Sequence, residues 1–280
     1  INGSYPGPTI RAKWGDTIVV NVKNNMAHNG TGIHWHGVRQ FQSCQHDGVP
    51  GITECPIAPG KTRQYRFKAT QFGTTWYHSH WSIQYGDGVL GTMIIDGPAT
   101  ANYDEDLGTL PITDYYYTPA FTLNEIAQQS QGGPPTPDNI LVNGTHINAN
   151  GGGQYAKMTV TKGKKYRIRI INTSVDSTFS VSLDGHPFTV MTADFVPIQP
   201  YVADQITLAI GQRYDVMIEA NQTASNYWFR VGYGSCGDNN ILRSGIQLGA
   251  ILSYTGAPSG NPTTTGVALR TACVDEDRFK

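Results

Sequence analysis

The sequence predicts an all-β protein composed of two Greek-key β-sandwiches in tandem. Short apolar runs that alternate with polar residues recur along the chain, which is the pattern of half-buried strands. The 32 glycines and 16 prolines among 280 residues supply the many turns that such strands need. The second half of the sequence also repeats the first, and this length is enough for two domains of ordinary size.

The predicted first domain covers residues 1–98. Residues 16–24 and 63–69 alternate between apolar and polar side chains, as expected for strands with one buried face. Residues 89–95 form a continuous apolar run, which predicts a strand buried on both faces. The sequence Asp96-Gly97-Pro98 then breaks the pattern, and we expect the domain to end there.

The predicted second domain covers residues 99–280. It begins with an aromatic patch and a short helix around residues 123–129, which the Gly-Gly-Pro-Pro sequence at 132–135 ends. Further strands begin at residues 139, 158, 166, 179, 202, 214, 227 and 246. Strands this short and this evenly spaced favour a Greek-key sandwich.

An internal repeat relates the two domains. The pattern of glycine, alternating apolar residues and asparagine at 15–24 recurs at 163–172. The four histidines of the first copy, however, are replaced in the second. The aligned pairs are His34 and Ser182, His36 and Asp184, His78 and Arg230, and His80 and Gly232. A purely structural role gives no reason for all four histidines to be lost together, so we expect them to act as a set.

These four histidines are half of the eight in the chain, and they form two His-x-His pairs. In a strand, residues i and i+2 point to one face and lie about 6.6 Å apart along the strand. Two such strands side by side would gather four imidazoles, a ligand set that suits copper, zinc, iron or nickel. The alternative is four surface histidines that share a spacing by chance. The adjoining Trp35 and Tyr77, in strand-like sequence, favour the metal site.

Composition excludes some partners and suggests a compartment. A net charge of −1 with 15% charged residues predicts no nucleic-acid partner, and no apolar run is long enough for a membrane span. The chain starts at Ile1 without a signal peptide, so we expect that a leader was removed or that the chain starts late. Five glycosylation sequons predict a secreted, extracellular glycoprotein with N-linked glycans at some of Asn2, Asn29, Asn143, Asn172 and Asn221. The four cysteines lack zinc-site spacing and predict disulfides: Cys44, Cys55, Cys236 and Cys273.

Other motifs predict no site. The glycines of residues 86–91 match a dinucleotide-binding pattern, but an apolar strand follows where a helix would be needed. Asp47 precedes Gly48, so it is also explained as the start of a turn. Three further histidines lie singly in turn-like sequence, where we expect them to be solvated: His28, His146 and His186.

Several motifs together closely resemble the first two cupredoxin domains of fungal laccases, within the multicopper oxidases. In the first domain these are residues 33–37, 47–48, 54–57, 73–80 and 84–88. In the second they are residues 114–117, 143–145, 171–175 and 211–216. The resemblance covers essentially the whole chain and is strongest to the ascomycete branch.

The resemblance implies an oxidase that removes single electrons from phenols and reduces dioxygen to water at copper. It implies that His34 binds the type 2 copper and that His36, His78 and His80 bind the type 3 pair of a trinuclear cluster. Asp47 would help to move protons during oxygen reduction, and Asp176 would lie at the phenol pocket. Such laccases carry type 1 copper and four further histidines in a third domain. That domain and the first strands are expected to be absent from residues 1–280, unless the former is a separate chain.

Several alternatives stay open. The chain also fits another multicopper oxidase, such as an ascorbate oxidase or a ferroxidase, or a catalytically silent copper- or zinc-binding module. A two-domain laccase would need its own type 1 Cys–His set, which we do not find. Cys236 and Cys273 are expected to form a disulfide that stabilises the second domain by a few kcal/mol. The resemblance implies a partner for Cys55 outside the chain, and a Cys44–Cys55 bridge is the competing pairing.

Overall fold

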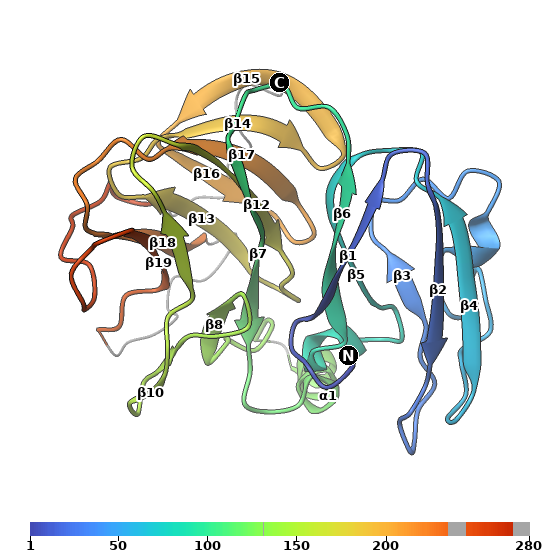
Figure 1. Cartoon of the computed structure of the whole chain (residues 1–280). Coiled ribbons are helices and arrows are strands. Elements are labelled where there is room, and N and C mark those ends of the chain that lie inside the picture. Colours follow the sequence, from blue (N-terminus) through green and yellow to red (C-terminus); the bar gives the residue numbers. More distant parts are fainter. Residues whose placement is uncertain (131, 235–244, 271–280) are drawn as a thin grey trace. The chain divides into compact units, whose positions relative to one another are not determined.

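A computed structural model describes residues 1–130, 132–234 and 245–270, and its elements are almost all β-strands (Figure 1). The all-β prediction is therefore confirmed. The chain divides into two compact units. The first unit consists of Ile1–Pro98, Thr118–Gly133 and Asp194–Val196; the second consists of Ala99–Tyr117, Pro134–Ala193 and Pro197–Lys280. Among the described residues, no helix is long and apolar enough to cross a membrane.

The first unit is built from two sheets around one core. One sheet has the strand order β1-β6-β5-β3 and the other pairs β2 with β4. Their bounds are β1 Gly7–Lys13, β2 Thr17–Lys23, β3 Ile33–Trp35, β4 Thr62–Lys68, β5 Gly73–Ser79 and β6 Leu90–Asp96. Short 3-10 helices cover Cys44–His46 (η1) and Gln84–Asp87 (η2). Strands β2 and β4 pair antiparallel and bury alternate residues, and β6 is buried on both faces, as their sequence patterns predict.

The core of the first unit fixes the strand that carries the first histidine pair. Trp35 at the end of β3 is fully buried and contacts the rings of Tyr65, Phe67 and Tyr77. Because side chains alternate along a strand, burial of Trp35 turns its neighbours His34 and His36 to the opposite face. The apolar side chain between the two histidines therefore orients both of them.

The helix α1 spans Ala120–Gln129, three residues longer at its start than the sequence suggested. The Asp87 carboxylate accepts a hydrogen bond of 2.7 Å from the Ala120 backbone N–H, which has no partner within the helix. Asp87 lies in the glycine-rich segment 86–91. The strand β6 begins at Leu90, inside this segment. A dinucleotide site would have a helix at this point.

The second unit contains a five-stranded and a six-stranded sheet around a second core. The five-stranded sheet has the order β11-β19-β18-β13-β16, with bounds β11 Lys157–Val160, β13 Thr178–Leu183, β16 Gln205–Leu208, β18 Asn226–Gly234 and β19 Gly249–Tyr254. The six-stranded sheet has the order β15-β14-β17-β12-β7-β8, with bounds β7 Glu105–Tyr115, β8 Asn139–Val142, β12 Lys165–Asn172, β14 Phe188–Ala193, β15 Val196–Ala203 and β17 Arg213–Glu219. A small hairpin pairs β9 Ile147–Asn148 with β10 Gly152–Gly153.

The internal repeat is visible in matching hydrogen bonds of two buried asparagines. Asn24 donates to the Ile57 carbonyl at 2.8 Å and accepts from the Met26 N–H at 3.0 Å. Asn172 donates to the Leu208 carbonyl and accepts from the Ser174 N–H, both at 3.0 Å. In each copy the side chain thus ties the end of a strand to a distant strand or loop.

The prediction that His146 and His186 are solvated is wrong. His146 and His186 are 5% and 2% exposed, not solvated, because each packs within the second unit and hydrogen-bonds there. The His186 imidazole lies 2.6 Å from the Tyr254 hydroxyl and 2.7 Å from the Asp184 carbonyl. The sequon residue Asn172 is fully buried and holds two carbonyls, so a glycan there is incompatible with this fold.

The cysteines divide into two groups. Cys44 and Cys55 are both exposed and are not joined in a disulfide. The expected Cys236–Cys273 disulfide lies outside the described residues.

Candidate metal centre

Strands β3 and β5 place the two histidine pairs beside each other. The strands are antiparallel, and His34 lies directly opposite His78 in their register. Backbone hydrogen bonds from His36 to Trp76 and from His80 to Gly32, both 3.1 Å, continue the pairing past the strand ends. All four sequence-predicted ligands therefore emerge from one continuous stretch of paired backbone.

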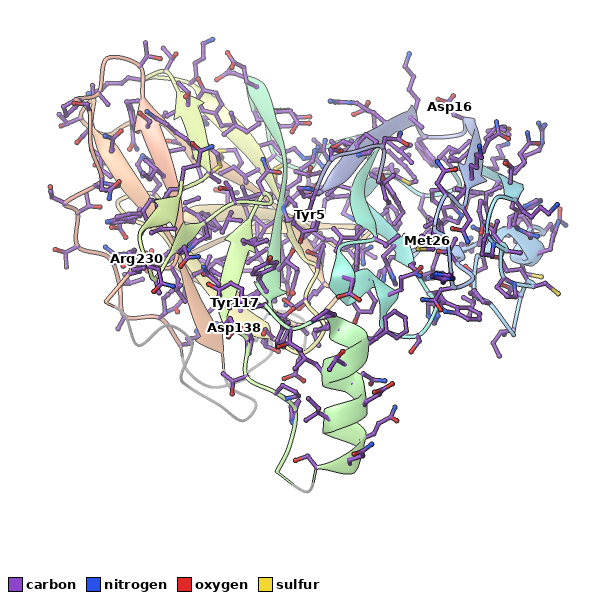
Figure 2. All side chains as sticks on the ribbon, turned by 90° about the horizontal axis from the view of Figure 1, so that it is seen from below. Tyr5, Asp16, Met26, Tyr117, Asp138 and Arg230 are labelled. Atoms are coloured by element: carbon purple, nitrogen blue, oxygen red, sulfur yellow. The ribbon has the colours of Figure 1, made fainter. Side chains whose placement is uncertain are left out.

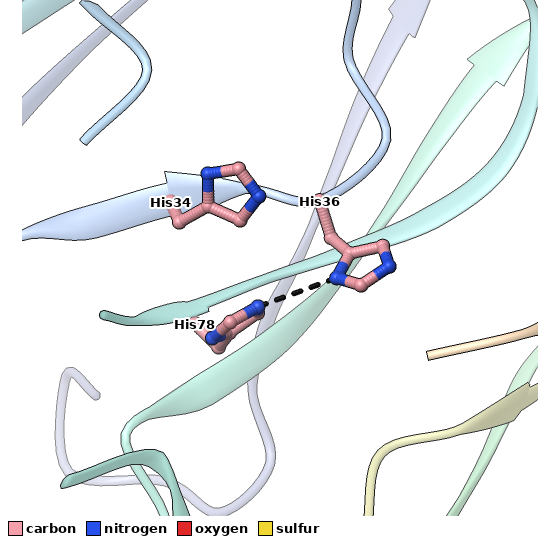
Figure 3. Close-up of side chains that lie close together, drawn as sticks. All are labelled: His34, His36 and His78. Carbon is pink, nitrogen blue, oxygen red and sulfur yellow. Dashed lines mark hydrogen bonds between the residues drawn. The ribbon is translucent and has the colours of Figure 1, made fainter. Parts of the chain in front are cut away.

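The imidazoles lie close enough to share a metal. The ring centroid of His34 is 5.9 Å from that of His36, 5.4 Å from that of His78 and 5.3 Å from that of His80. Ligand nitrogens of His34, His36 and His78 all lie within 4.8 Å of one another (Figure 3). His80 is exposed and lies at the edge of these rings. We call the imidazoles of His34, His36, His78 and His80 the histidine cluster.

Backbone carbonyls set the protonation of two rings. His34 Nδ1 lies 2.9 Å from the Asp47 carbonyl oxygen, and His78 Nδ1 lies 3.0 Å from that of Ser79. A carbonyl only accepts hydrogen bonds, so each Nδ1 carries the proton and each Nε2 presents a lone pair. His78 Nε2 lies 3.4 Å from His36 Nδ1. This donor set fits a transition-metal ion bound by neutral imidazole.

Burial keeps His78 in the ligand form. Desolvation lowers the pKa of His78 well below its ordinary value; the hydrogen bond to the Ser79 carbonyl opposes this shift, and the neighbouring imidazoles add to it. The ring is therefore neutral at physiological pH, as a metal ligand must be.

An aromatic platform that the sequence analysis missed supports two of the rings. Trp76 stacks on His78 at a centroid distance of 4.0 Å and on His36 at 5.0 Å, and it is almost completely buried. Trp76 lies two residues before His78 on the same strand, so it shares the face of that histidine. This spacing was the available signal.

Asp47 contacts the cluster through its backbone and lies near it through its side chain. Its carboxylate Oδ1 is 3.4 Å from His34 Nδ1. The next residue, Gly48, has a φ of +80°, and a Cβ there would lie 1.7 Å from the Ile33 carbonyl oxygen. Only glycine permits the loop to approach β3 this closely.

A second buried group holds β3 from its other end. The Tyr65 hydroxyl accepts a 3.1 Å hydrogen bond from the Ile33 N–H and donates to Glu54 at 2.7 Å. The Arg63 guanidinium lies 2.7 Å from the other oxygen of the Glu54 carboxylate. Desolvation raises the pKa of Glu54, while Tyr65 and Arg63 act in the opposite direction. The sequence pattern at these three residues predicted no role for them at the site.

Asp176 is not part of the histidine cluster. It lies in the second unit, on the loop between β12 and β13, and its side chain is exposed. Partial burial raises the pKa of its carboxyl group.

The second unit carries an ion pair where the first carries ligands. Ser182 lies opposite Arg230 in the register of β13 and β18, as His34 lies opposite His78. Arg230 Nε lies 2.7 Å from Asp184 Oδ1, and Thr264 donates to the same carboxylate. The two units thus share the same pairing of strands, but the positions that hold histidines in the first unit hold an ion pair and a serine in the second.

Comparisons with known proteins agree with this architecture. Two family profiles described as multicopper oxidase match residues 1–100 and 106–257. Laccase-3 of Botryotinia fuckeliana is 57% identical over 274 residues, which are 97% of this chain and 60% of that protein.

Solved structures give the same result. The laccase from Botrytis aclada superposes with a TM-score of 0.92 at 47% identity, over 98% of this chain and 52% of that one. Fet3p, a multicopper oxidase that functions in iron import, gives a TM-score of 0.83 at 29% identity, over 95% and 50%. The chain spans about half the length of most relatives it matches. The tandem cupredoxin-like fold is thereby confirmed, and the chain belongs to the multicopper oxidase family.

Proposed function

We propose that the chain forms part of a secreted laccase. The observation that carries the proposal is the histidine cluster, in which three ligand nitrogens lie within 4.8 Å of one another. The laccase relatives, at about half identity over nearly the whole chain, favour this activity over ascorbate or iron oxidation. The substrates would be phenols and dioxygen.

In this proposal His34 binds type 2 copper, and His36, His78 and His80 bind the type 3 pair. Bound copper would supply the redox chemistry that takes electrons from phenols one at a time and reduces dioxygen to water. The chain's own contribution is to fix the rings through the Asp47 and Ser79 carbonyls and the Trp76 platform. We further propose that type 1 copper and the other ligands come from sequence outside residues 1–280.

Two carboxylates have separate proposed roles. Asp47 Oδ1, near His34 Nδ1, would hold and pass on a proton at the edge of the cluster. The Asp176 carboxylate would accept the proton of a phenol hydroxyl as the electron leaves, which is general-base assistance. Its raised pKa, caused by partial burial, supports this role because a stronger base accepts the proton more readily.

The remaining proposals concern organisation and processing. We propose domains at residues 1–98 and 99–280 of the sequence, with copper ligands only in the first; residues 118–133 and 194–196 of the second belong to the first compact unit. We also propose N-linked glycans at some of the four exposed sequon asparagines, Asn2, Asn29, Asn143 and Asn221.

The test uses the full protein with His34→Ala and His78→Ala, and His28→Ala as the matched control because His28 is single and exposed. We expect the first two variants to lose copper by elemental analysis and to lose oxidation of both phenolic and non-phenolic donors. The control should keep both. Full copper content and turnover in His34→Ala and His78→Ala would contradict the proposal, and zinc alone in the wild type would indicate a silent metal-binding module.

A further inference from the structure

Asp114 is a buried carboxylate that accepts four hydrogen bonds from one loop. It lies in β7, is 3% exposed, and is 61 to 63 residues away in sequence from the loop it contacts. Oδ1 accepts from the Val175 N–H at 2.9 Å, and Oδ2 accepts from the N–H groups of Asp176 at 3.0 Å and Ser177 at 3.1 Å. The Ser177 hydroxyl donates a fourth hydrogen bond from the loop, at 2.9 Å, and the Tyr116 hydroxyl donates a longer one, at 3.4 Å, from outside it.

This carboxylate has no salt-bridge partner among the described residues. Desolvation raises the pKa of Asp114, and the hydrogen bonds from the loop only partly offset that cost. An uncharged side chain of similar shape would avoid the desolvation cost. It could not, however, accept from three consecutive backbone N–H groups, since an asparagine directs an NH₂ group at one or more of those donors. The arrangement therefore secures the shape of this loop.

Other contacts between β7 and the loop act in the same direction. The Asp114 N–H donates to the Ser174 hydroxyl at 3.3 Å, and the hydroxyls of Thr113 and Thr173 lie 2.6 Å apart. The whole segment from 173 to 177 is thus fixed through its backbone and its small polar side chains.

The exception within this loop is the Asp176 side chain. Its backbone N–H is held by Asp114, but its carboxylate makes no hydrogen bond or ion pair among the described residues. The loop is therefore ordered entirely by other groups, and the exposed carboxylate stays available to a ligand. A loop aspartate that served only to cap its own turn would use its carboxylate for that purpose.

We propose that Asp114 is a positioning residue for phenol oxidation, which holds the loop so that the free Asp176 carboxylate is presented in one fixed place. This inference rests on the proposed role of Asp176 as the phenol base. A base acts only within hydrogen-bond reach of the proton it removes, and a displacement of about 1 Å can cost up to about a hundredfold in rate. The carboxylate of Asp114 would thus act on the substrate through the backbone of Asp176.

The experiment measures kcat and KM of the full protein for a phenol and for a non-phenolic electron donor. The variants are Asp114→Asn, Asp176→Asn, their combination and Ser177→Ala. The control is Asp138→Asn, an exposed carboxylate that accepts from the Tyr117 N–H at 2.8 Å in the same unit (Figure 2). We expect Asp114→Asn to raise the phenol KM on the order of tenfold. The non-phenolic KM, the copper spectrum and the control should be unchanged.

Two features distinguish positioning from general stabilisation. The double variant should be no worse than Asp176→Asn, because both changes remove one function. Ser177→Ala removes one of the four bonds from the loop and keeps the carboxylate, so it should raise the phenol KM about two- to threefold and remain folded.

The outcomes separate this inference from the proposed function. If Asp176→Asn leaves phenol oxidation unchanged, the proposed role of Asp176 fails. If Asp176→Asn is selective for phenol but folded Asp114→Asn is not, only the positioning role is overturned. Equal losses on both donors in Asp114→Asn also overturn it. If Asp114→Asn does not fold, Ser177→Ala decides the question: an unchanged phenol KM in that variant overturns the positioning role of Asp114.

Discussion

His34 and His78 face each other across β3 and β5, with ring centroids 5.4 Å apart and each Nδ1 bonded to a backbone carbonyl. The main-chain carbonyls of Asp47, just after η1, and of Ser79, at the end of β5, therefore help to orient the two rings. Substitutions that move those backbone segments should consequently affect the cluster, even where no ligand is changed.

Gly48→Ala should lower the free energy of unfolding by more than the cost of placing alanine at a positive φ. The new Cβ would lie 1.7 Å from the Ile33 carbonyl oxygen, so β3 or the loop that bears Asp47 must shift. Gly51→Ala is the matched control, because Gly51 has a φ of +86° but no atom near its absent Cβ. We expect the control to lose about 1–2 kcal/mol in urea unfolding and Gly48→Ala to lose more, together with copper. Equal losses would contradict the steric argument.

Tyr65→Phe should cost about 1–3 kcal/mol of unfolding free energy. It removes the partner of the Ile33 N–H and one donor to the buried Glu54 carboxylate. Tyr117→Phe, at an exposed hydroxyl, should change stability little. Chemical denaturation of both variants checks the difference. A Tyr65→Phe protein as stable as the wild type would show that Glu54 and β3 do not depend on this hydroxyl.

Buried His186 should make stability fall at acid pH. Desolvation lowers the pKa of His186 in the folded state, so below about pH 6.5 the unfolded chain binds the proton first. The contribution of His186 to the free energy of unfolding is therefore complete above that pH, and it declines as the pH falls towards the lowered pKa. His186→Gln should reduce the loss of melting temperature between pH 7 and pH 5, whereas His28→Gln should not. An unchanged pH dependence in His186→Gln would exclude His186 as its source.

A protein of residues 1–280 alone should show neither intense blue absorption nor phenol turnover. Type 1 copper needs a cysteine thiolate with two histidines, and the sequence contains no His-Cys-His string. Among the described residues, the two cysteines are exposed in the first unit, Cys44 in η1 and Cys55 outside the helices and strands. Absorption spectra and oxidase assays of the copper-loaded fragment test this. Turnover by a verified chain of this length would refute the argument.

The sequence predicted the elements whose signal is local. Alternation located β2 and β4, and the His-x-His spacing placed the imidazoles on one face of each strand. The contacts that orient them depend on segments far apart in the chain. The approach of Gly48 to Ile33 and the bonds of Asp114 to residues 175–177 have no local periodicity. The burial of His146 and His186 was missed for the same reason, because turn-like sequence does not reveal what packs over it.

In the second unit the Arg230 guanidinium pairs with the Asp184 carboxylate, whereas the histidine cluster of the first unit gathers imidazole nitrogens that a cation can bind. An ion that binds only the folded form stabilises it by mass action. If copper binds the histidine cluster as proposed, its supply should therefore stabilise the first unit and leave the second unit unchanged. In apoprotein formed under copper starvation, the second unit would then have its normal stability, and the first unit would be more susceptible to proteolysis than its copper-loaded form.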